Sequence, residues 1–441
     1  MNDGVCIIGA GSSGIAACQV LGERGIEHVC FEKGSHIGGN WRYRNDNGQS
    51  AAYRSLHINT PRDMMSYRAY PMPEDYPVYP DHFRIARYFD DYADRFGIRE
   101  RIRFGTEVTS VEPAGDRWRV SWRESESGGE GSEEFAAVVV ANGHHWNPRW
   151  PEPAFPGADG FAGEQIHAHA YDEPGQVEGR RVLVVGLGNS ACDIAVESSR
   201  HAAQTLLSVR TGNWVLPKYL LGKPTNDLNG PAASRVPVAM QKRMMTRLVR
   251  TIVGDMSDYG LPQPEHMVGE QHPTLSTDLL SRISHGEIET RSNLESFTGG
   301  NGVRFIDGRE DEIDLVVYCT GYRITFPFLS PQIEDPTDNQ IDLYRRVVSV
   351  DNPGLYFIGL IQPLGATMPI AELQSKWIAD LVEGAAELPP REAMRKAIAD
   401  QDAAMRRQYT TSKRHTIQVD FHPYLRELER ERRERRITQR A

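Results

Sequence analysis

The sequence predicts an α/β protein with two parallel β-sheets, the second inserted into the domain that carries the first. Two short apolar stretches, Val5–Ile8 and Arg181–Val185, are each followed at once by a glycine-rich turn and a segment with helical periodicity. A further apolar stretch follows each helix, which completes the strand, turn, helix and strand order of a βαβ unit. We therefore predict two Rossmann-like dinucleotide-binding domains in one chain.

Length and composition fit this fold. The chain has 441 residues, of which 39% are apolar and 25% charged, as in a globular protein of roughly two or three domains. Its formal charge of −10 argues against a nucleic-acid partner, because proteins that bind nucleic acid are usually basic. No apolar run approaches the ~20 residues that span a bilayer, and polar residues lead into the first strand. We expect no signal peptide, no membrane partner and a cytoplasmic location.

The cysteines indicate no metal or dithiol site. None of them forms a Cys-x-x-Cys pair, so their spacing predicts neither a zinc site nor a redox disulfide. We expect free thiols in a reducing compartment and no bound metal. The cysteines are Cys6, Cys18, Cys30, Cys192 and Cys319.

The first glycine turn, Gly9-Ala10-Gly11-Ser12-Ser13-Gly14, has the Gly-x-Gly-x-x-Gly spacing of a pyrophosphate site. Its glycines let the backbone approach the phosphates, and the helix that follows directs its positive N-terminal end toward them. The next strand, His28–Phe31, ends at Glu32, whose carboxylate can accept both ribose hydroxyls of an adenosine. The predicted binding residues of this turn and strand are Gly9, Gly11, Ser12, Ser13, Gly14, Glu32 and Lys33.

Residues 33–80 interrupt the regular pattern and are rich in Gly, Asn, Pro and Tyr. Irregular segments of this length in compact domains are usually functional. After them we expect a helix over 82–96, strands over 101–111, 118–122 and 136–141, and a hairpin tip over 125–134.

The second glycine turn is Gly186-Leu187-Gly188-Asn189-Ser190-Ala191. The strand after its helix, Gln204–Val209, does not lead to a carboxylate, and Ser208, Arg210 and Thr211 stand there instead. A cation at this place suits the 2′-phosphate of NADPH, so we expect the site to prefer NADPH to NADH. The predicted binding residues are Gly186, Gly188, Asn189, Ser190, Ser208, Arg210 and Thr211.

The order of the remaining elements predicts the domain boundaries. We expect a helix over 236–253, buried strands near 314–318 and 355–360, and a helix from Pro369 to about Leu381. Residues 1–161 and 320–441 would form the domain of the first nucleotide, and residues 162–319 an inserted domain for the second. Residues 220–260 include a stretch with no recognisable pattern and are a possible cap on a substrate channel.

Two dinucleotide sites in one chain indicate electron transfer between two nucleotides. Because the chain has neither a dithiol nor a metal cluster, a cofactor must carry out the redox step. The simplest pair is FAD at the first site and NADPH at the second. Oxygen or a small molecule is then the expected electron acceptor.

Residues 161–171 lie between the two glycine turns and contain Phe161, Gly163, His167 and Tyr171 in the pattern Phe-x-Gly-x-x-x-His-x-x-x-Tyr. With this pattern in this position, nearly the whole chain resembles the flavin-containing monooxygenases, which oxygenate nitrogen and sulfur atoms of soft nucleophiles. Further matching stretches are Gly38–Trp41, Asn59–Met65, Gly186–Ala195, Ser208–Trp214, Cys319–Tyr322, Glu372–Gln374 and Arg414–Val419.

The resemblance implies that NADPH reduces FAD and that a C4a-hydroperoxyflavin passes oxygen to a sulfide, an amine or an indole-like small molecule. The protein must then exclude water and donate hydrogen bonds. Asn59 matches the family's asparagine beside flavin and nicotinamide, and we expect it to be the catalytic residue, because an amide donates and accepts without titrating. By the same resemblance Gly39, Asn40 and Trp41 would line the flavin, and Thr60 would touch it.

Further roles are implied for residues of both domains. Gln374 is expected at the start of a helix, which would point its N-terminus at flavin N1, where positive charge stabilises the reduced flavin. The backbone of Val108 would contact the adenine, and Tyr171 belongs to the nucleotide-binding residues. The family's stretch around His167 is mainly a linker, so we expect a structural or NADP-positioning role for this residue.

Several other functions stay open. A pyridine-nucleotide:disulfide reductase has a similar layout but needs the dithiol that is missing here. A Baeyer–Villiger monooxygenase is disfavoured because those relatives carry tryptophan where this chain has Tyr171; conversion of a ketone would indicate one. Rapid release of peroxide would indicate an uncoupled NADPH oxidase. An FAD-binding interaction protein that uses the charged C-terminal helix would consume no NADPH.

The sequence does not identify the substrate. A primary alkylamine with a pKa like that of lysine, ~10.4, is neutral in only about one molecule per thousand near pH 7. This favours sulfides, tertiary amines and indoles. We expect a small-molecule substrate and O2 as partners, and a homodimer because dimers are the commonest assemblies.

Overall fold

The computed structural model describes residues 4–226, 238–408 and 416–433. By their internal contacts they fall into two compact units. The first unit lies within Met1–Ala52, Thr60–Asn147 and Arg323–Ala441, and the second comprises Tyr53–Asn59 and Pro148–Tyr322. The predicted α/β fold with two parallel sheets is confirmed. The contacts divide the chain at 147/148 and 322/323, which are 14 and 3 residues from the predicted boundaries at 161/162 and 319/320. They also separate residues 53–59 from the first unit, which the sequence did not predict.

The first unit is built on a seven-stranded sheet with the order β22-β23-β24-β7-β1-β2-β3. Its strands from β24 to β3 are parallel, and β1 and β7 are buried along their whole length, as their continuous apolar sequences predict. The strands are β1 Val5–Ile8, β2 His28–Phe31, β3 Ile102–Arg103, β7 Ala137–Val140, β22 Leu343–Tyr344, β23 Val348–Ser349 and β24 Leu355–Phe357.

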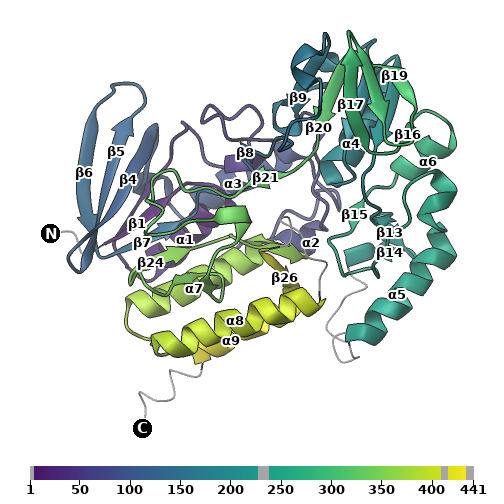
Figure 1. Ribbon diagram of the computed structural model, residues 1–441. Coiled ribbons are helices and arrows are strands. Elements are labelled where there is room, and N and C mark those ends of the chain that lie inside the picture. The colour runs from purple at the N-terminus through teal and green to yellow at the C-terminus, as the bar shows by residue number, and fades with distance from the viewer. Residues whose placement is uncertain (1–3, 227–237, 409–415, 434–441) are drawn as a thin grey trace. The chain divides into compact units, whose positions relative to one another are not determined.

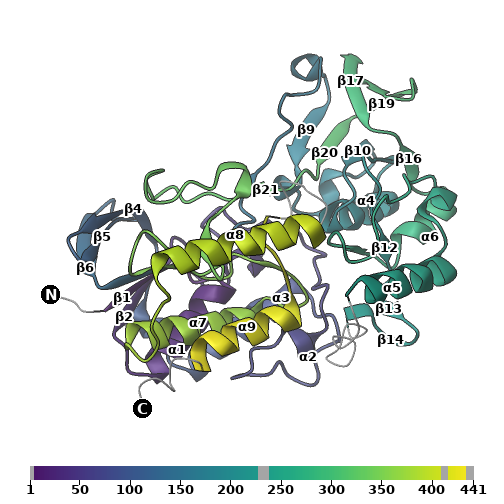
Figure 2. The same cartoon turned by 60° about the horizontal axis from the view of Figure 1, so that its bottom comes forward.

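Different layers cover the two faces of this sheet. Helix α1 (Ser12–Glu23) packs against α7 (Met368–Val382), and α9 (Phe421–Arg433) lies alongside α7 (Figures 1 and 2). On the other face, the antiparallel strands β4 (Thr106–Ala114), β5 (Arg117–Glu124) and β6 (Glu130–Phe135) share one apolar core with β1 and β7. The unit also contains α2 Arg62–Met65, α3 His82–Arg95, α8 Arg391–Gln408, β25 Gln362–Leu364 and β26 Gln418–Asp420.

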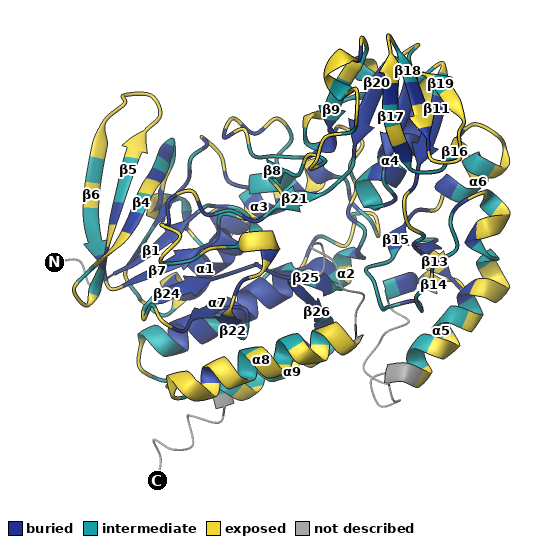
Figure 3. Ribbon diagram, viewed as in Figure 1, coloured by how far each residue is buried: buried dark blue, intermediate teal, exposed yellow. Residues whose placement is uncertain are grey.

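The second unit is built on a five-stranded parallel sheet with the order β16-β11-β10-β20-β9. Buried residues concentrate in its three central strands, β11, β10 and β20, as Figure 3 shows. The strands are β9 Glu164–His167, β10 Arg181–Val185, β11 Gln204–Ser208, β16 Glu289–Arg291 and β20 Leu315–Tyr318. The other elements of the unit are α4 Asn189–His201, α5 Val238–Val253, α6 Leu279–Ser284, β12 Val215–Leu216, β13 Tyr219–Leu220, β14 Lys223–Pro224, β15 Thr274–Leu275, β17 Leu294–Gly299, β18 Gly302–Phe305 and β19 Glu310–Glu312. Strands β8 (Asn147–Pro148) and β21 (Tyr322–Arg323) lie where the chain changes units.

Three predicted elements differ from the structure. The strand expected over 101–111 is broken at Gly105, whose φ of 58° separates β3 from β4. Part of the hairpin tip expected over 125–134 is β6, because paired strands extend beyond the apolar pattern. The stretch interpreted mainly as a linker contains β9, an edge strand of the second sheet. The helix expected over 236–253 is α5, and residues 227–237 of the predicted cap lie outside the described residues.

Candidate functional site

The first glycine turn fits tightly between β1 and α1. Gly9 has a φ of 98°, a backbone conformation that L side chains rarely adopt. A Cβ at Gly14 would lie 1.8 Å from the carbonyl oxygen of Gly9, so only glycine allows α1 to approach the strand this closely. The N-cap Gly11 has no side chain to cap the first turn of α1. These features suit a phosphate at the N-terminus of the helix.

The Gly39–Trp41 turn lies against this glycine turn. The amide of Gly38 donates to the carbonyl oxygen of Ala10 at 3.0 Å, and a Cβ at Gly39 would lie 3.0 Å from Cα of Gly11. Asn40 Oδ1 accepts a 2.8 Å hydrogen bond from the amide of Ala51. Two predicted flavin-site segments, far apart in the sequence, therefore meet at facing glycines in the first unit.

Glu32 is buried at the end of β2 and is already well hydrogen-bonded. Its Oε2 accepts from the amide of Ala10 at 2.7 Å, and its Oε1 accepts from the amide of Gly34 at 2.9 Å and from Asn47 Nδ2 at 3.1 Å. Burial raises the pKa of the carboxyl, and the three hydrogen bonds oppose that shift. Glu32 thus fixes the glycine turn as well as standing at the predicted ribose position.

The other predicted flavin-site residues of this unit differ in their exposure to solvent and in their polar contacts. Ser13 is buried and Ser12 half-buried at the start of α1. Lys33 forms an ion pair with Glu107, Nζ to Oε1, at 2.9 Å. Thr60 Oγ1 donates to the carbonyl oxygen of Gly365 at 3.3 Å. Trp41 is half-buried, and Val108 is buried on β4.

Gln374 is fully buried and lies in the second turn of α7, which begins at Met368. Its Oε1 accepts from the amide of Gly359 at 2.9 Å, and its Nε2 donates to the hydroxyl of Tyr424 at 2.9 Å. The prediction that Gln374 stands at the start of the helix is therefore wrong by about a turn. Its amide fixes the backbone at Gly359, where a Cβ would lie 2.0 Å from Ser13 Oγ.

The second glycine turn joins β10 to α4. Gly186 has a φ of 126°, and a Cβ there would lie 2.9 Å from the carbonyl oxygen of Cys319. Gly188 is the N-cap of α4 and caps it with no side chain. Asn189 Oδ1 accepts a 3.0 Å hydrogen bond from the amide of Leu275. Ser190, half-buried, is the second residue of α4, so this helix also presents an N-terminus suited to phosphate.

The predicted binding residues at the end of β11 and just beyond it comprise one buried and two exposed positions. Ser208 is fully buried, donates to the carbonyl oxygen of Ser292 at 2.9 Å and accepts from the amide of Leu294 at 3.0 Å. Arg210 and Thr211 are exposed. Within the part of the chain that the structure describes, Arg210 forms no ion pair, which leaves its guanidinium available to a phosphate.

His167 and Tyr171 are buried side chains in the second unit. His167 Nδ1 accepts from the amide of His169 at 3.0 Å, and burial lowers the pKa of this ring to about 4. The Tyr171 hydroxyl donates to Glu197 Oε2 at 2.5 Å. Burial raises the pKa of Tyr171, and its carboxylate partner raises it further. A neutral, packed histidine agrees with the expected structural or positioning role.

Asn59 ends a short segment, Tyr53–Asn59, that belongs to the second unit. The Tyr53 hydroxyl donates to Asp193 Oδ2 on α4, and the amide of Arg54 donates to the carbonyl oxygen of Asp172 at 2.8 Å. Sequence reasoning missed Tyr53, Asp193 and Glu197. The acidic residues of α4 carry a weak signal, because carboxylates on a helix that packs on a sheet need partners.

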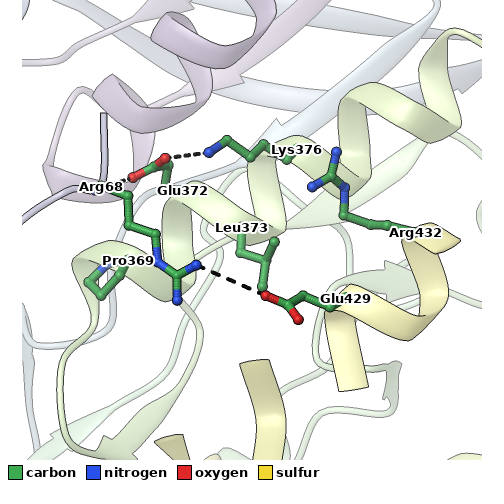
Figure 4. A pocket seen from close by; sticks show the side chains of 7 residues that line it. All are labelled: Arg68, Pro369, Glu372, Leu373, Lys376, Glu429 and Arg432. Carbon is green, nitrogen blue, oxygen red and sulfur yellow. Dashed lines mark hydrogen bonds and ion pairs between the residues drawn. The ribbon is translucent and has the colours of Figure 1, made fainter. Parts of the chain in front are cut away.

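A pocket of about 250 Å³ in the first unit does not contain any predicted site residue. On one side of the pocket, Lys376 Nζ donates a 2.5 Å hydrogen bond to Glu372 Oε1 (Figure 4). Arg68 faces Glu429 at 4.0 Å on the other side. The charges of the pocket are thus largely paired with one another. It is lined by Arg68, Pro369, Glu372, Leu373, Lys376, Glu429 and Arg432.

The described residues contain no cluster of three or more side chains that could hold a metal ion, and all five cysteines are free thiols. Across the same residues, no helix combines the length and the apolar character that crossing a bilayer requires.

Comparison with known proteins agrees with this arrangement. A family model described as flavin-binding monooxygenase-like matches residues 2–433. The chain is similar to flavin-containing monooxygenase 5 of Rattus norvegicus, with 37% identity over 435 residues that cover 95% of this chain and 80% of the relative. It is 35% identical over 441 residues to dimethylaniline monooxygenase (N-oxide-forming) 2 of the same organism, covering 96% of this chain and 81% of that one.

Solved structures are similar over nearly the whole chain. The structure of S-allyl-L-cysteine S-oxygenase from Allium sativum has a TM-score of 0.73 and 26% identity, and the match covers 99% of this chain and 91% of that one. An open crystal structure of cyclohexanone monooxygenase has a TM-score of 0.70 and 20% identity, covering 97% and 96%. The second likeness concerns the fold alone.

Proposed function

The chain belongs to the flavin-binding monooxygenase-like family, and on that premise we propose that it oxygenates neutral soft nucleophiles, with thioethers as the preferred substrates. It is an NADPH-dependent flavin monooxygenase that uses FAD and O2 and acts on a small molecule. The observation that carries the assignment of two nucleotide cofactors is the pair of glycine turns, each at the N-terminus of a helix without a side-chain cap.

We assign FAD to the first unit and NADPH to the second. Bound FAD, once reduced by NADPH, supplies the activation of O2. The first turn and the facing Gly39 leave room for a pyrophosphate against the backbone. The residues proposed to hold FAD are Gly9, Gly11, Ser12, Ser13, Gly14, Glu32, Lys33, Gly39, Asn40, Trp41, Thr60, Val108 and Gln374. Those proposed to hold NADPH are Tyr171, Gly186, Gly188, Asn189, Ser190, Ser208, Arg210 and Thr211.

We propose Asn59 as the catalytic residue. An amide side chain can donate one hydrogen bond and accept another at any working pH, because it does not titrate. Its task would be to orient the reacting groups and to hold water away from them. Replacement by Asp would add a negative charge and remove the donor, and should separate NADPH oxidation from oxygen transfer.

The preference for thioethers rests on protonation and on one relative. A thioether has no proton to lose before its lone pair can react, whereas a primary alkylamine is neutral in only about one molecule per thousand near pH 7. The Allium sativum S-oxygenase, whose structure aligns with 99% of this chain, is named for a thioether amino acid. The N-oxide-forming relative supports tertiary amines as the second class.

A substrate panel tests the proposal. NADPH consumption, O2 consumption and product are measured together for small thioethers, tertiary amines, indole and a cyclic ketone. Sulfoxide formed in step with NADPH use is the expected result. A lactone or ester from the ketone would establish the Baeyer–Villiger alternative. Peroxide in proportion to NADPH with every compound would establish an oxidase, and no NADPH use at all would overturn the assignment of the second nucleotide.

We also propose a cytoplasmic homodimer. All five cysteines are free thiols, which suits a reducing compartment, and dimers are the commonest assemblies of soluble enzymes. Light scattering coupled to gel filtration of the FAD-loaded protein measures the assembly directly. A mass equal to that of one chain would contradict the dimer.

A further inference from the structure

Helix α4 presents two carboxylates one turn apart, and each accepts a hydrogen bond from a buried tyrosine. Asp193 and Glu197 are four residues apart on α4 and so lie on the same face. Asp193 Oδ2 accepts from the hydroxyl of Tyr53, and Glu197 Oε2 accepts from that of Tyr171 at 2.5 Å. The rings of the two tyrosines meet edge to face, with centroids 6.1 Å apart.

The two tyrosines come from segments that are far apart in the sequence. Tyr171 follows β9 in the second unit, whereas Tyr53 begins the segment Tyr53–Asn59, which the first unit flanks on both sides in the sequence. Despite this, Tyr53 is 4% exposed and belongs to the apolar core of the second unit. Leu56 packs against the same core. Contacts with α4 and its surroundings thus fix a segment that the sequence would assign elsewhere.

A second contact holds the same segment. The amide of Arg54 donates to the carbonyl oxygen of Asp172 at 2.8 Å, and Arg54 Nη1 lies 3.6 Å from Glu173 Oε2. The ion pair is exposed and adds little, whereas the Tyr53–Asp193 hydrogen bond is partly buried and its tyrosine side chain is buried. Because the hydroxyl group of a buried tyrosine is costly to leave without a hydrogen-bond partner, Tyr53 is the dominant anchor.

The same helix begins at the second glycine turn. Asp193 is the fifth residue of α4, whose first residue is Asn189 and whose N-cap is Gly188. A helix transmits a displacement at its N-terminus to a side chain one turn along, because its backbone hydrogen bonds make it rigid. The anchor of the segment therefore stands one helical turn from the position proposed for the NADPH pyrophosphate.

We propose that Tyr53 is a positioning residue: its hydrogen bond to Asp193 ties the segment Tyr53–Asn59 to helix α4, so that nucleotide bound at the N-terminus of α4 governs the placement of Asn59. The inference rests on the proposed function in its use of Asn59. The link between nucleotide and segment is a property of the second unit and stands or falls separately.

Hydrogen–deuterium exchange on the FAD-loaded protein tests the link. Adding NADP⁺ to the unaltered protein should slow exchange both at the start of α4 and in peptides that contain residues 53–59. In Tyr53→Phe, α4 should keep its protection, while the NADP⁺-dependent protection of residues 53–59 should fall by about tenfold. Equal protection of residues 53–59 in the variant and the unaltered protein would overturn the proposal.

The coupling of NADPH oxidation to oxygen transfer supplies a second readout, which a purely structural role of Tyr53 would not change. Tyr53→Phe should release more peroxide per NADPH consumed, while KM for NADPH stays within about twofold. Asp193→Asn keeps an acceptor for the hydroxyl and should retain most of the coupling, whereas Asp193→Leu removes the acceptor and should behave like Tyr53→Phe. A loss of coupling in Asp193→Asn equal to that in Asp193→Leu would contradict the role of the hydrogen bond.

Tyr344→Phe is the matched control. The Tyr344 hydroxyl donates to Glu431 Oε1 at 2.6 Å in the first unit, so this variant removes a comparable tyrosine–carboxylate hydrogen bond. Exchange in residues 53–59 and peroxide release should match the unaltered protein. If Tyr53→Phe and Tyr344→Phe lost coupling equally, the effect would be general loosening, and the proposal would fail.

The two proposals fail in different ways. If no thioether is oxidised but NADP⁺ still protects residues 53–59 through Tyr53, the substrate assignment fails and the anchor stands. If thioethers are oxidised and NADP⁺ protects residues 53–59 equally in Tyr53→Phe, the anchor fails and the proposed function stands.

Discussion

Glu32 Oε2 accepts a 2.7 Å hydrogen bond from the amide of Ala10, the second residue of the first glycine turn. The carboxylate at the end of β2 therefore holds the turn that precedes α1, in addition to its proposed contact with the ribose. A residue chosen from the sequence for its reach toward a ligand also supports the backbone that surrounds that ligand.

Glu32→Gln should weaken FAD retention and the stability of the first unit. Because each carboxylate oxygen of Glu32 accepts from a backbone amide, the side-chain nitrogen of glutamine must face a backbone donor in either orientation. One buried hydrogen bond is then unmade, at a cost of about 1–3 kcal/mol. FAD content after gel filtration and the urea midpoint measure the two effects. Glu112→Gln, an exposed exchange on β4, is the control. Unchanged FAD content in Glu32→Gln would contradict both proposed roles.

Gly14→Ala should abolish FAD binding, whereas the reverse exchange in the other turn should be mild. The added Cβ would lie 1.8 Å from the Gly9 carbonyl oxygen, and backbone cannot yield by that amount without losing the turn. At the equivalent position of the second turn, Ala191 already packs a Cβ and is fully buried. Ala191→Gly should cost only about 1 kcal/mol of stability, from helix propensity. Thermal unfolding with and without FAD compares the two variants. A stable, FAD-loaded Gly14→Ala protein would refute the packing argument.

Arg210→Ala should raise KM for NADPH and leave KM for NADH nearly unchanged. A hydrogen bond to a charged group contributes about 1.5–3 kcal/mol, which corresponds to about 10- to 100-fold in KM. Steady-state kinetics with both nucleotides measure the change. Arg309→Ala removes another exposed arginine from the second unit and should change neither constant. An equal rise for NADPH and NADH would show that Arg210 does not read the 2′-phosphate.

His167 should make the protein less stable as the pH falls from about 6.5 to about 4. Burial lowers the pKa of the folded ring to about 4, whereas the unfolded ring has its ordinary value near 6.5, so the unfolded state binds the proton first. The loss at pH 5 relative to pH 7 amounts to about 2 kcal/mol. His167→Gln should remove this part of the acid loss in urea titrations at the two pH values. His285→Gln, at an exposed histidine, should leave it in place. An unchanged difference between pH 5 and pH 7 in His167→Gln would contradict the prediction.

The sequence by itself determined the features that are local in the chain. The two glycine turns, the strands Val5–Ile8 and Arg181–Val185 and the helices after them follow from spacing and apolar periodicity over a dozen residues or so. For the same reason the sequence predicted two parallel sheets, and the ordered motifs along it indicated the family. The glycines at Gly9 and Gly186 carry this information directly, because few other residues adopt their positive φ.

Only the tertiary structure decided which distant side chains meet. Tyr53 and Asp193 are 140 residues apart, and no local sequence pattern around either residue predicts its contact with the other. The same holds for the facing backbones of Gly11 and Gly39, and for β9, whose short polar sequence becomes an edge strand only because β20 is there to pair with it. Contacts of this kind depend on the removal of both partners from water, which packing creates and a local pattern does not encode. That is why the glycine turns proposed to bind the nucleotides could be recognised in the sequence, whereas the proposed anchor of Asn59 could not.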